Sequence, residues 1–367
     1  MTRNESSPAN TLDVSGDENK TGTPEWLACP DCGGRLLLRD SQVQCNCCER
    51  AWRVLEGIPH FVEDFPYWGE IPLENMLAVN RQAESTSWKA ALVDSADPTV
   101  RRAAGMILNL ERANWQWLLD LPEASRVLDV GAGTGTNSHA LAMHYREVIA
   151  LEPVLERVRF MRHRFAQEAL SNITIVRSSL WTLPFAPHSF DLIVMNGVLE
   201  WVAEGLTGDP RELQLAALKK MHRLLRPGGY LYIGIENRMC PEYLFGCLDP
   251  HCRLPFVTLM PRRLAHWYAR RHGKPNGYRN YLYSSRGYRK LLAAAGFQST
   301  DFYLAFPSYN HPRYLVPMKD HVFTHYYRSF DPMRSDWIRG LAHELLLKSG
   351  LRKYMEDSYV IFARKAR

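Results

Sequence analysis

The sequence of 367 residues has no uninterrupted apolar run near the roughly 18 residues that a membrane-spanning helix needs. Its first 24 residues are polar and lack the apolar centre of a secretory signal, so we expect a disordered tail at 1–24 and a cytoplasmic protein. Acidic residues are scarce within 219–290, where only Glu236, Glu242 and Asp249 occur. This bias indicates either an anionic substrate or a basic solvated face.

Hydrophobic residues make up 46% of the chain and charged residues 23%, which are ordinary values for a globular protein. Disorder through most of the chain and a fibrous repeat are therefore excluded. The length leaves room for two or three domains.

Five of the eight cysteines lie close together near the N-terminus. Cys29 and Cys32 form one C-x-x-C pair, and Cys45 and Cys48 form a second pair twelve residues later. This spacing predicts a structural zinc site in which four thiolates surround the ion. Cys47 is a fifth thiol that competes with Cys45 or Cys48, although the spacing of the first pair favours those two. Free buried thiols or a disulfide are the alternative, which a reducing compartment disfavours.

The series CPDCGG, CNCC and WRVLEGIPHF lies within residues 26–64. It resembles the small zinc-binding domain of the activator subunit shared by tRNA and protein methyltransferases. Residues 35–38 and 42–44 are the expected arms of a hairpin between the cysteine pairs. In the family, a strand and a Gly-Ile-Pro turn end this domain, and here they would end it near residue 59. The resemblance points to methyl transfer and makes the module a candidate docking surface for a protein partner.

Residues 70–120 carry apolar side chains at helical spacing and show no strand alternation. Pro98 is expected to separate two helices, because the residue before a proline disfavours the helical conformation. We therefore expect a helical cap that packs on the following domain.

A β-branched run at 127–130 leads into a glycine-rich turn and then a predicted helix at 138–144. Such a strand–turn–helix unit binds nucleotides, because glycines let backbone amides approach the ligand closely. The spacing is G-x-G-x-G, with Thr136 at the last glycine position of the dinucleotide motif G-x-G-x-x-G. A tight turn without a ligand could use the same glycines.

Further strands follow at 147–151, 173–177, 189–196 and 230–233, the last after a helix end and a Pro-Gly-Gly turn. The acid Glu152, at the end of the first of these, can accept two hydrogen bonds from a ribose diol. Strands alternating with helices predict an α/β fold with a Rossmann-like, doubly wound sheet. With a sixth strand at 298–306 and an antiparallel seventh at 357–366, this sheet is seven-stranded and mostly parallel.

The series LDVGAGTG, ALEP, LPF, SFDLIVMNGVLEW and LLRPGGYLYI is similar to the class I S-adenosylmethionine-dependent methyltransferases, type 11-like, over about residues 105–305. Many relatives carry an aspartate at the position of Ser179, so this chain departs from the family's pattern there. The resemblance implies that S-adenosylmethionine is held at its methionine part by Asp129, Gly131, Ala132, Gly133 and Gly135, at its ribose by Glu152, and at its adenine by Ser179, Leu180 and Asn196.

The segments IENR, DPH, YSSRGYRKLLAAAGF and PSYNHPRYLVP are similar to methyltransferases of bacterial glycan gene clusters. This second resemblance implies O-methylation of a sugar-containing or other small-molecule acceptor. His251 is then the candidate general base, with Glu236 as a second catalytic candidate and Arg238 shaping the pocket. A structural loop histidine is the alternative interpretation of His251.

Two other functions remain open from the sequence. A four-cysteine module fused to this fold also resembles bacterial rRNA guanine methyltransferases, so rRNA or tRNA docked by the zinc module is the alternative acceptor. No Asn-Pro-Pro-Tyr-type turn follows the fourth strand, where the chain reads Asn196-Gly197-Val198-Leu199, which argues against one kind of base methylation. The second alternative is a non-catalytic scaffold that binds a partner, against which the glycine turn and Glu152 argue.

The sequence therefore predicts five segments in chain order. They are a disordered tail at 1–24, a zinc-ribbon-like module at 25–65, a helical cap or linker at 66–120, a methyltransferase core at 121–306, and a lid insertion with the final core strand at 307–367.

Overall fold

The computed structural model describes residues 23–39, 41–330 and 344–367. Apart from its last two residues, the predicted disordered tail lies outside the described part of the chain. The chain divides into two compact units: the first comprises residues up to Val194 together with Arg223–Gly229, and the second comprises Met195–His222 and Tyr230–Arg367. Among the described residues, no helix has both the length and the apolar character needed to cross a membrane.

The cysteine-rich module begins the first unit. Four short strands pair in chain order, each antiparallel to the next: β1 (Leu36–Arg39), β2 (Gln42–Cys45), β3 (Ala51–Leu55) and β4 (Ile58–Pro59). The first two form the hairpin that the sequence predicts. Leu36 and Val43 point inward from this hairpin and are fully buried. Gly57 takes a positive φ of 76° at the turn before β4, a conformation that glycine adopts readily.

Backbone hydrogen bonds join this module to the rest of the first unit. Beyond β4, His60 forms a parallel bridge with Arg177, whose amide donates to Pro59 O at 3.0 Å. The Arg177 guanidinium also donates to the carbonyls of Val62 and Glu63. At the other end of the module, Leu27 forms an antiparallel bridge with residue 185. The module is therefore tied to the unit at both of its ends.

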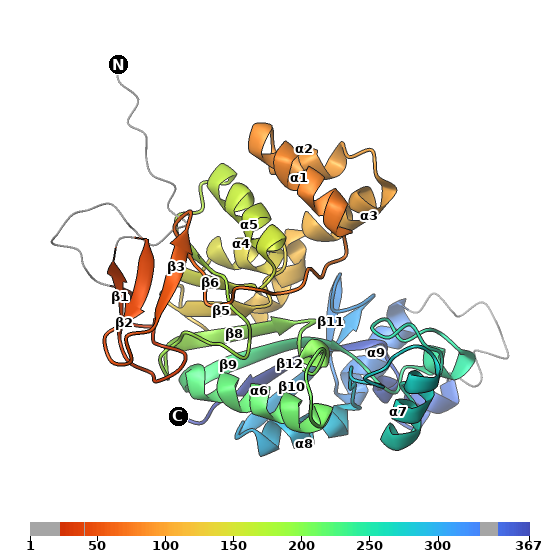
Figure 1. The fold of residues 1–367 in the computed structure, drawn as a ribbon. Coiled ribbons are helices and arrows are strands. Elements are labelled where there is room, and N and C mark those ends of the chain that lie inside the picture. Colours follow the sequence, from red (N-terminus) through yellow and green to blue (C-terminus); the bar gives the residue numbers. More distant parts are fainter. Residues whose placement is uncertain (1–22, 40, 331–343) are drawn as a thin grey trace. The chain divides into compact units, whose positions relative to one another are not determined.

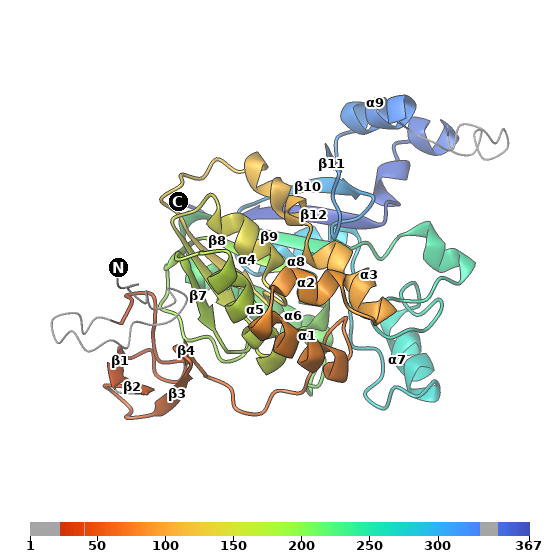
Figure 2. The same cartoon turned by 90° about the horizontal axis from the view of Figure 1, so that it is seen from above.

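The predicted helical cap follows, and its helices are α1 (Leu73–Ser85), α2 (Trp88–Val93), α3 (Pro98–Ile107) and the 3-10 helix η1 (Leu110–Leu118). Pro98 begins α3, as expected, and Asp97 caps the helix by accepting from the amides of Thr99 and Val100. Helices α1, α2 and α3 share one apolar cluster with Phe160 of α5 (Leu155–Gln167). Figures 1 and 2 show α1 and α2 near α5 in both views.

The parallel strands of the first unit are β5 (Arg126–Val130), β6 (Glu147–Leu151), β7 (Ile173–Val176) and β8 (Phe190–Asn196), in the order β8-β5-β6-β7. The last two residues of β8 belong to the second unit. Helix α4 (Thr136–Ala142) follows β5 after the glycine turn, and α5 follows β6. This is the strand–turn–helix arrangement that the sequence predicts.

The second unit contains antiparallel strands in the order β9-β12-β10-β11. They are β9 (Leu225–Glu236, shared with the first unit), β10 (Ser299–Phe306), β11 (Tyr314–Pro317) and β12 (Ser358–Arg364). The remaining helices described are η2 (Leu199–Trp201), α6 (Pro210–Leu224), η3 (Pro241–Phe245), α7 (Arg262–Arg271), α8 (Ser285–Ala294), α9 (Asp320–Phe330) and η5 (Arg352–Tyr354).

Two details of the predicted strands were wrong. Strands β5 to β12 number eight and not seven, because β11 forms within the predicted lid insertion, where it pairs Val316 with the buried Leu304 of β10. The predicted Pro-Gly-Gly turn is also absent, since β9 runs through these residues from Leu225. A Cβ on Gly229 would lie 3.0 Å from the Asp191 carbonyl oxygen, so this glycine permits a close approach of two backbone segments.

A buried pair on α4 and α5 predicts how stability changes with pH. Arg164 Nε donates to His139 Nδ1 at 3.2 Å, and burial together with this positive charge lowers the pKa of His139 to about 4. In the unfolded state the imidazole has a pKa of about 6.5, so between about pH 6.5 and pH 4 it binds a proton there but not in the native state. The contribution of His139 to the free energy of unfolding should therefore be most favourable above pH 6.5. By pH 5 it should lower the free energy of unfolding by about 2 kcal/mol.

Thermal and urea unfolding of the full chain at pH 7 and pH 5 measures this loss. His139→Gln is expected to reduce the difference between the two pH values, whereas His144→Gln, just beyond α4, should retain it. An equal pH dependence in wild-type protein and His139→Gln would contradict the prediction.

Candidate functional site

The glycine turn after β5 uses its glycines for two different purposes. Gly131, Gly133 and Gly135 have φ values of +66°, +61° and +79°, which other residues rarely adopt. A Cβ on Gly135 would lie 2.5 Å from Phe165 Cζ, so Gly135 allows α5 to pack against the turn. A Cβ on Gly133 would meet nothing closer than Arg157 Nη1 at 3.8 Å. The backbone at Gly133 is therefore open to the close approach of a ligand.

Glu152 is tied directly to this turn. The Gly133 amide donates to Glu152 Oε2 at 2.8 Å, and the Val154 amide donates to Oε1 at 3.1 Å. The residue is only 2% exposed, and burial raises the pKa of its carboxyl. A carboxylate offers about four acceptor positions, so two remain for the two hydroxyls of a ribose. The residues present therefore fit the predicted nucleoside.

The other cofactor candidates are distributed over both units. Asp129 is buried on β5 and accepts from Ser138 Oγ at 2.7 Å, and burial raises the pKa of its carboxyl to about 6. Ser179 and Leu180 follow β7 and are half-buried, and Ser179 Oγ accepts from the Trp181 amide at 3.2 Å.

Two remaining candidates make contacts of other kinds. Ala132 donates its amide to Leu151 O at 3.0 Å, which fixes the glycine turn to the end of β6. Asn196 belongs to the second unit, where its Oδ1 accepts from Tyr232 OH at 2.9 Å. The structure thus brings the glycine turn and Glu152 together through Gly133.

The four predicted zinc ligands lie in one group. Their Sγ atoms all lie within 4.8 Å of one another, with Cys29 to Cys48 at 3.6 Å and Cys32 to Cys45 at 3.5 Å. Thiolates about 2.3 Å from one tetrahedral zinc ion lie about 3.8 Å apart, so the donor set fits zinc. Cys47 is exposed and is not part of this group.

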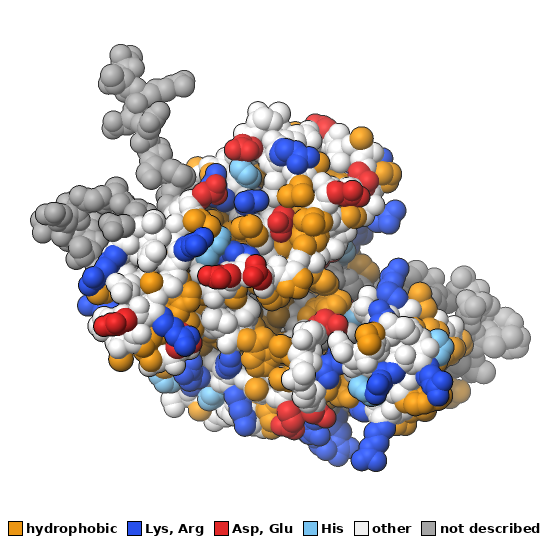
Figure 3. Space-filling model, viewed as in Figure 1, with side chains coloured by type: hydrophobic (Ala, Val, Ile, Leu, Met, Phe, Trp, Pro, Cys, Tyr) orange, Lys and Arg blue, Asp and Glu red, His pale blue; other side chains and the backbone are white. Residues whose placement is uncertain are grey.

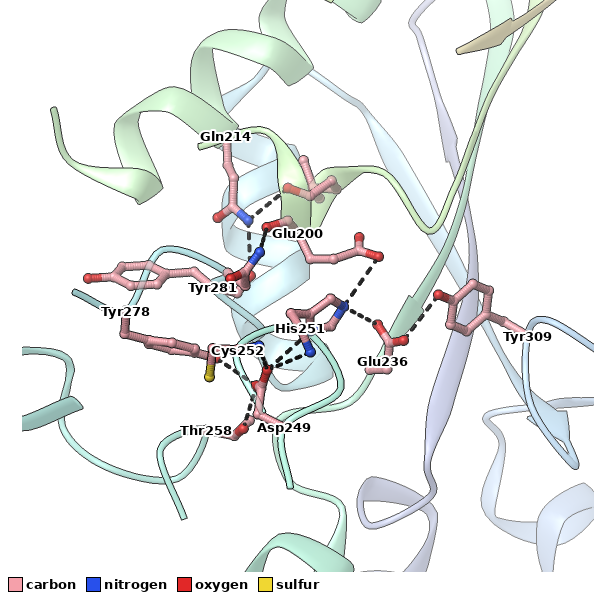
Figure 4. A network of polar contacts seen from close by, with 12 residues as sticks. Glu200, Gln214, Glu236, Asp249, His251, Cys252, Thr258, Tyr278, Tyr281 and Tyr309 are labelled. Atoms are coloured by element: carbon pink, nitrogen blue, oxygen red, sulfur yellow. Dashed lines mark hydrogen bonds and ion pairs between the residues drawn. The ribbon is translucent and has the colours of Figure 1, made fainter. Parts of the chain in front are cut away.

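A second buried group of titratable side chains lies in the second unit (Figure 4). His251 Nε2 is 3.7 Å from Glu200 Oε1 and 3.7 Å from Glu236 Oε2, and its Nδ1 is 3.4 Å from Asp249 Oδ1. The four side chains are between 0% and 13% exposed. The structure therefore brings the two catalytic candidates, His251 and Glu236, together. We call Glu200, Glu236 and His251 the acid–histidine cluster.

The cluster is held by the secondary structure around it. Glu236 is the last residue of β9, and its Oε1 accepts from Tyr309 OH at 3.1 Å. Glu200 lies on η2, whose Leu199 carbonyl accepts from the buried Gln214 amide at 2.9 Å. Asn280 Nδ2 donates to the Glu200 carbonyl at 3.2 Å. Glu236 is thus fixed by the end of a strand, and Glu200 by a short helix.

Burial and mutual charge shift the pKa values in the cluster. Burial, reinforced by the nearby charge of Glu200, raises the pKa of Glu236 to about 7. Burial alone lowers the pKa of His251, but the favourable interactions of its charged form with Asp249, Glu200 and Glu236 outweigh burial and raise the value to about 10. Burial opposes the ionisation of Asp249, yet interaction with His251 lowers its pKa to about 2.

The arginines of the basic segment 219–290 that are most buried bind the protein's own backbone. Arg238 donates to the carbonyls of residues 258–260, and Arg279 donates to carbonyls within 203–208. Arg238 therefore holds a loop. On the face drawn in Figure 3, Lys and Arg side chains are scattered with Asp and Glu between them.

Sequence reasoning missed Glu200 as a member of the cluster. Its signal was an acid four residues after the end of the apolar fourth strand, in the series MNGVLEW. It also missed the anchoring roles of Gln214 and Tyr309, which lie near the cluster only in the folded chain. No sequence signal marks Gln214, because it lies 14 residues after Glu200 in an ordinary amphipathic helix.

Residues 128–233, which include the glycine turn and Glu152, match the family model described as a methyltransferase domain. The biotin biosynthesis bifunctional protein BioHC of Cellvibrio japonicus is 34% identical over 157 residues, which are 42% of this chain and 26% of that protein. The ubiquinone biosynthesis O-methyltransferase of Vibrio cholerae is 29% identical over 149 residues, 40% of this chain and 54% of that protein.

Among solved structures, the phosphoethanolamine N-methyltransferase 2 of Haemonchus contortus is 14% identical, with a TM-score of 0.40, covering 78% of this chain and 57% of that one. The curated relatives described above are matched over about a quarter and about half of their length. The part of this chain that holds the candidate nucleoside site is thus the part that matches a methyltransferase domain.

Proposed function

We propose that this protein is an S-adenosylmethionine-dependent methyltransferase that O-methylates a small-molecule acceptor, with a sugar-containing molecule as the favoured class. The observation that carries the proposal is Glu152, a buried carboxylate tied to the Gly133 amide with acceptor positions left for a ribose diol. The match of residues 128–233 to a methyltransferase domain supports it. The acceptor class rests on the O-methyltransferase relatives and on the glycan-cluster motifs after β9.

The bound cofactor supplies a methyl group on a positively charged sulfur. An oxygen electron pair of the acceptor forms the new C–O bond, and the C–S bonding pair stays with sulfur, so the sulfur loses its charge. The chain must align the two partners, a contribution of up to about 7–11 kcal/mol, and must remove the hydroxyl proton. Proton removal by a positioned group typically contributes about 10²–10⁴-fold.

We assign the acceptor side of the reaction to the acid–histidine cluster. Glu236 and Glu200 offer carboxylate oxygens that have no hydrogen-bond partner among the described residues, namely both oxygens of Glu200 and Oε2 of Glu236. One of these oxygens can take the proton that a hydroxyl loses on methylation. His251 lies between them and is held by Asp249.

The test uses three separate reactions, each containing the full chain and methyl-labelled S-adenosylmethionine. The acceptor is a small-molecule extract in the first, sugar-containing intermediates in the second and total RNA in the third. We expect label in the small-molecule or sugar fraction. Label in RNA alone would contradict the small-molecule class and make RNA the acceptor. Binding of S-adenosylmethionine without any methyl transfer would favour a non-catalytic scaffold.

Glu236→Gln is expected to lower kcat by about 10²–10⁴-fold and to leave the affinity for S-adenosylmethionine unchanged, because it removes a negatively charged oxygen from the cluster that takes up the proton and keeps the side-chain shape. Glu242→Gln, which changes an exposed acid on η3, is the matched control and should retain kcat. Steady-state kinetics and calorimetry separate the two effects. Equal kcat values for the two variants would contradict the role of Glu236.

We also propose that the four thiols of Cys29, Cys32, Cys45 and Cys48 bind a structural zinc ion. A site with four protein ligands leaves no open position, so this ion would serve folding and not catalysis.

A further inference from the structure

The acid–histidine cluster has the geometry of a metal site. One ligand atom from each of Glu200, Glu236 and His251 can be chosen so that all three lie within 4.8 Å of one another. His251 Nε2 is 3.7 Å from an oxygen of each glutamate. Ligands about 2.1 Å from a common ion lie about 3.0–4.2 Å apart, depending on the angle between them. The three side chains thus surround a point that one ion can occupy.

Direct hydrogen bonding does not explain these distances. A charge-assisted N–H···O bond is about 2.7–2.9 Å long, and both contacts of Nε2 are nearly 1 Å longer. Glu200 is 1% exposed, and neither of its carboxylate oxygens has a hydrogen-bond partner among the described residues. Burying such a carboxylate without a partner is costly, and coordination of a cation removes that cost.

The surroundings of His251 match those of a metal-binding histidine. Such a histidine commonly presents one ring nitrogen to the ion and the other to a carboxylate that fixes the ring. Here Nε2 faces the two glutamates, and Nδ1 lies at an ion-pair distance of 3.4 Å from Asp249 Oδ1 without a hydrogen bond between them. Asp249 is itself fixed by the amides of His251 and Cys252 and by Thr258 Oγ1, at 2.8–2.9 Å. Tyr309 OH similarly donates a hydrogen bond to Glu236 Oε1, so that Oε2 remains to face His251.

The charges of these side chains also favour a bound cation. Three carboxylates, those of Glu200, Glu236 and Asp249, face a single imidazole within 4 Å. Even a protonated imidazole leaves this buried group with an excess of negative charge. A divalent ion balances it, and a donor set of one imidazole and two carboxylates suits a transition metal that accepts both nitrogen and oxygen ligands.

We propose that Glu200, Glu236 and His251 bind one divalent transition-metal ion, with Asp249 as a positioning residue. The ion would act as a Lewis acid toward the oxygen of an acceptor. The site rests on the geometry of the cluster, whereas this part in catalysis rests on the proposed function.

Manganese is the probe, because this hard divalent ion prefers carboxylate ligands to the thiolates of the cysteine site. The full chain is dialysed against EDTA to remove all metal and then given one equivalent of Zn²⁺, which the four thiolates bind in preference to the cluster because thiolates are the softer ligands. It is then titrated with Mn²⁺ while electron paramagnetic resonance follows the free ion. We expect one Mn²⁺ per chain, in addition to the zinc that metal analysis finds.

Variants assign this ion to the cluster. Asp249→Asn should weaken Mn²⁺ binding about 10–100-fold, and Glu200→Gln should weaken it at least as much. Glu242→Gln should bind as the wild type does. Circular dichroism and thermal unfolding confirm that each variant is folded, and the Gln and Asn replacements keep the side-chain shapes.

No bound Mn²⁺ in folded wild-type protein, or equal binding by wild type and Glu200→Gln, would overturn the proposal. Methyl transfer is a separate readout. Protein that binds one Mn²⁺ per chain but methylates no acceptor would contradict the proposed function and support the metal site. Full transfer by protein that lacks the second ion would remove the ion from catalysis.

Discussion

Glu152→Ala is expected to weaken binding of S-adenosylmethionine about 100-fold or more. The carboxylate would accept two hydrogen bonds from the ribose diol, and a hydrogen bond to a charged group contributes about 1.5–3 kcal/mol. Losing both costs at least about 3 kcal/mol, which is a factor of about 100 in the dissociation constant. The substitution also frees the Gly133 amide, so the turn that approaches the ligand loses its fixed position. Isothermal titration calorimetry measures the loss.

The same strand provides a control for stability. Glu147, at the opposite end of β6, accepts from Trp26 Nε1 and Arg126 Nε, so Glu147→Gln should lower the unfolding temperature and keep the affinity. Glu152→Gln should fall between wild type and Glu152→Ala, because its amide has only one accepting oxygen. Both ligands, S-adenosylmethionine and S-adenosylhomocysteine, should be affected alike, since they share the ribose. Wild-type affinity in both Glu152 variants would remove the ribose assignment.

The strands and the glycine turn could be predicted because their signals are local. The run at 127–130 is rich in apolar and β-branched residues, and the glycines that follow can take positive φ. Neighbouring residues therefore determine both the strand and the turn. Glu152 is also local, as the acid that ends the next strand. The cysteine pairs are local as well: their spacing favoured the four thiols that the structure groups, although it left Cys47 as a competitor.

The errors and omissions depend on contacts between distant residues. The Pro-Gly-Gly sequence favours a turn on its own, but the close approach of Gly229 to the Asp191 carbonyl keeps it within β9. Strand β11 forms because β10 offers an edge to pair with, which no local pattern announces. The acid–histidine cluster draws on η2, the end of β9 and the loop at Asp249, so its assembly needed the fold. His251 and Glu236 remain predictions as catalytic residues.

Removing the metal from the cysteine site is expected to unfold the N-terminal module. Structural zinc contributes about 10–16 kcal/mol in small zinc domains, more than a module of about 40 residues can obtain from its own core. Cys29→Ser, or treatment with a strong chelator, should therefore abolish hydrogen-exchange protection in β1 to β3. Protection should also fall at Arg177, because its amide donates to Pro59 O at the end of the module. Mass spectrometry of amide exchange, with metal analysis of the same sample, measures both effects.

Cys47→Ser is the matched control, because Cys47 is adjacent to Cys48 in the sequence but outside the group of four thiols. It should retain one zinc per chain and the protection of β1 to β3, whereas Cys48→Ser should lose both. Zinc loss in Cys47→Ser with retention in Cys48→Ser would mean that Cys47 is the fourth ligand. Full protection of the module in Cys29→Ser, or no zinc in gently purified wild-type protein, would contradict the zinc site itself. Because the parallel strands β5 to β8 have their own buried core, they should stay folded in Cys29→Ser, so the loss of protection should be confined to the module and the segments it contacts.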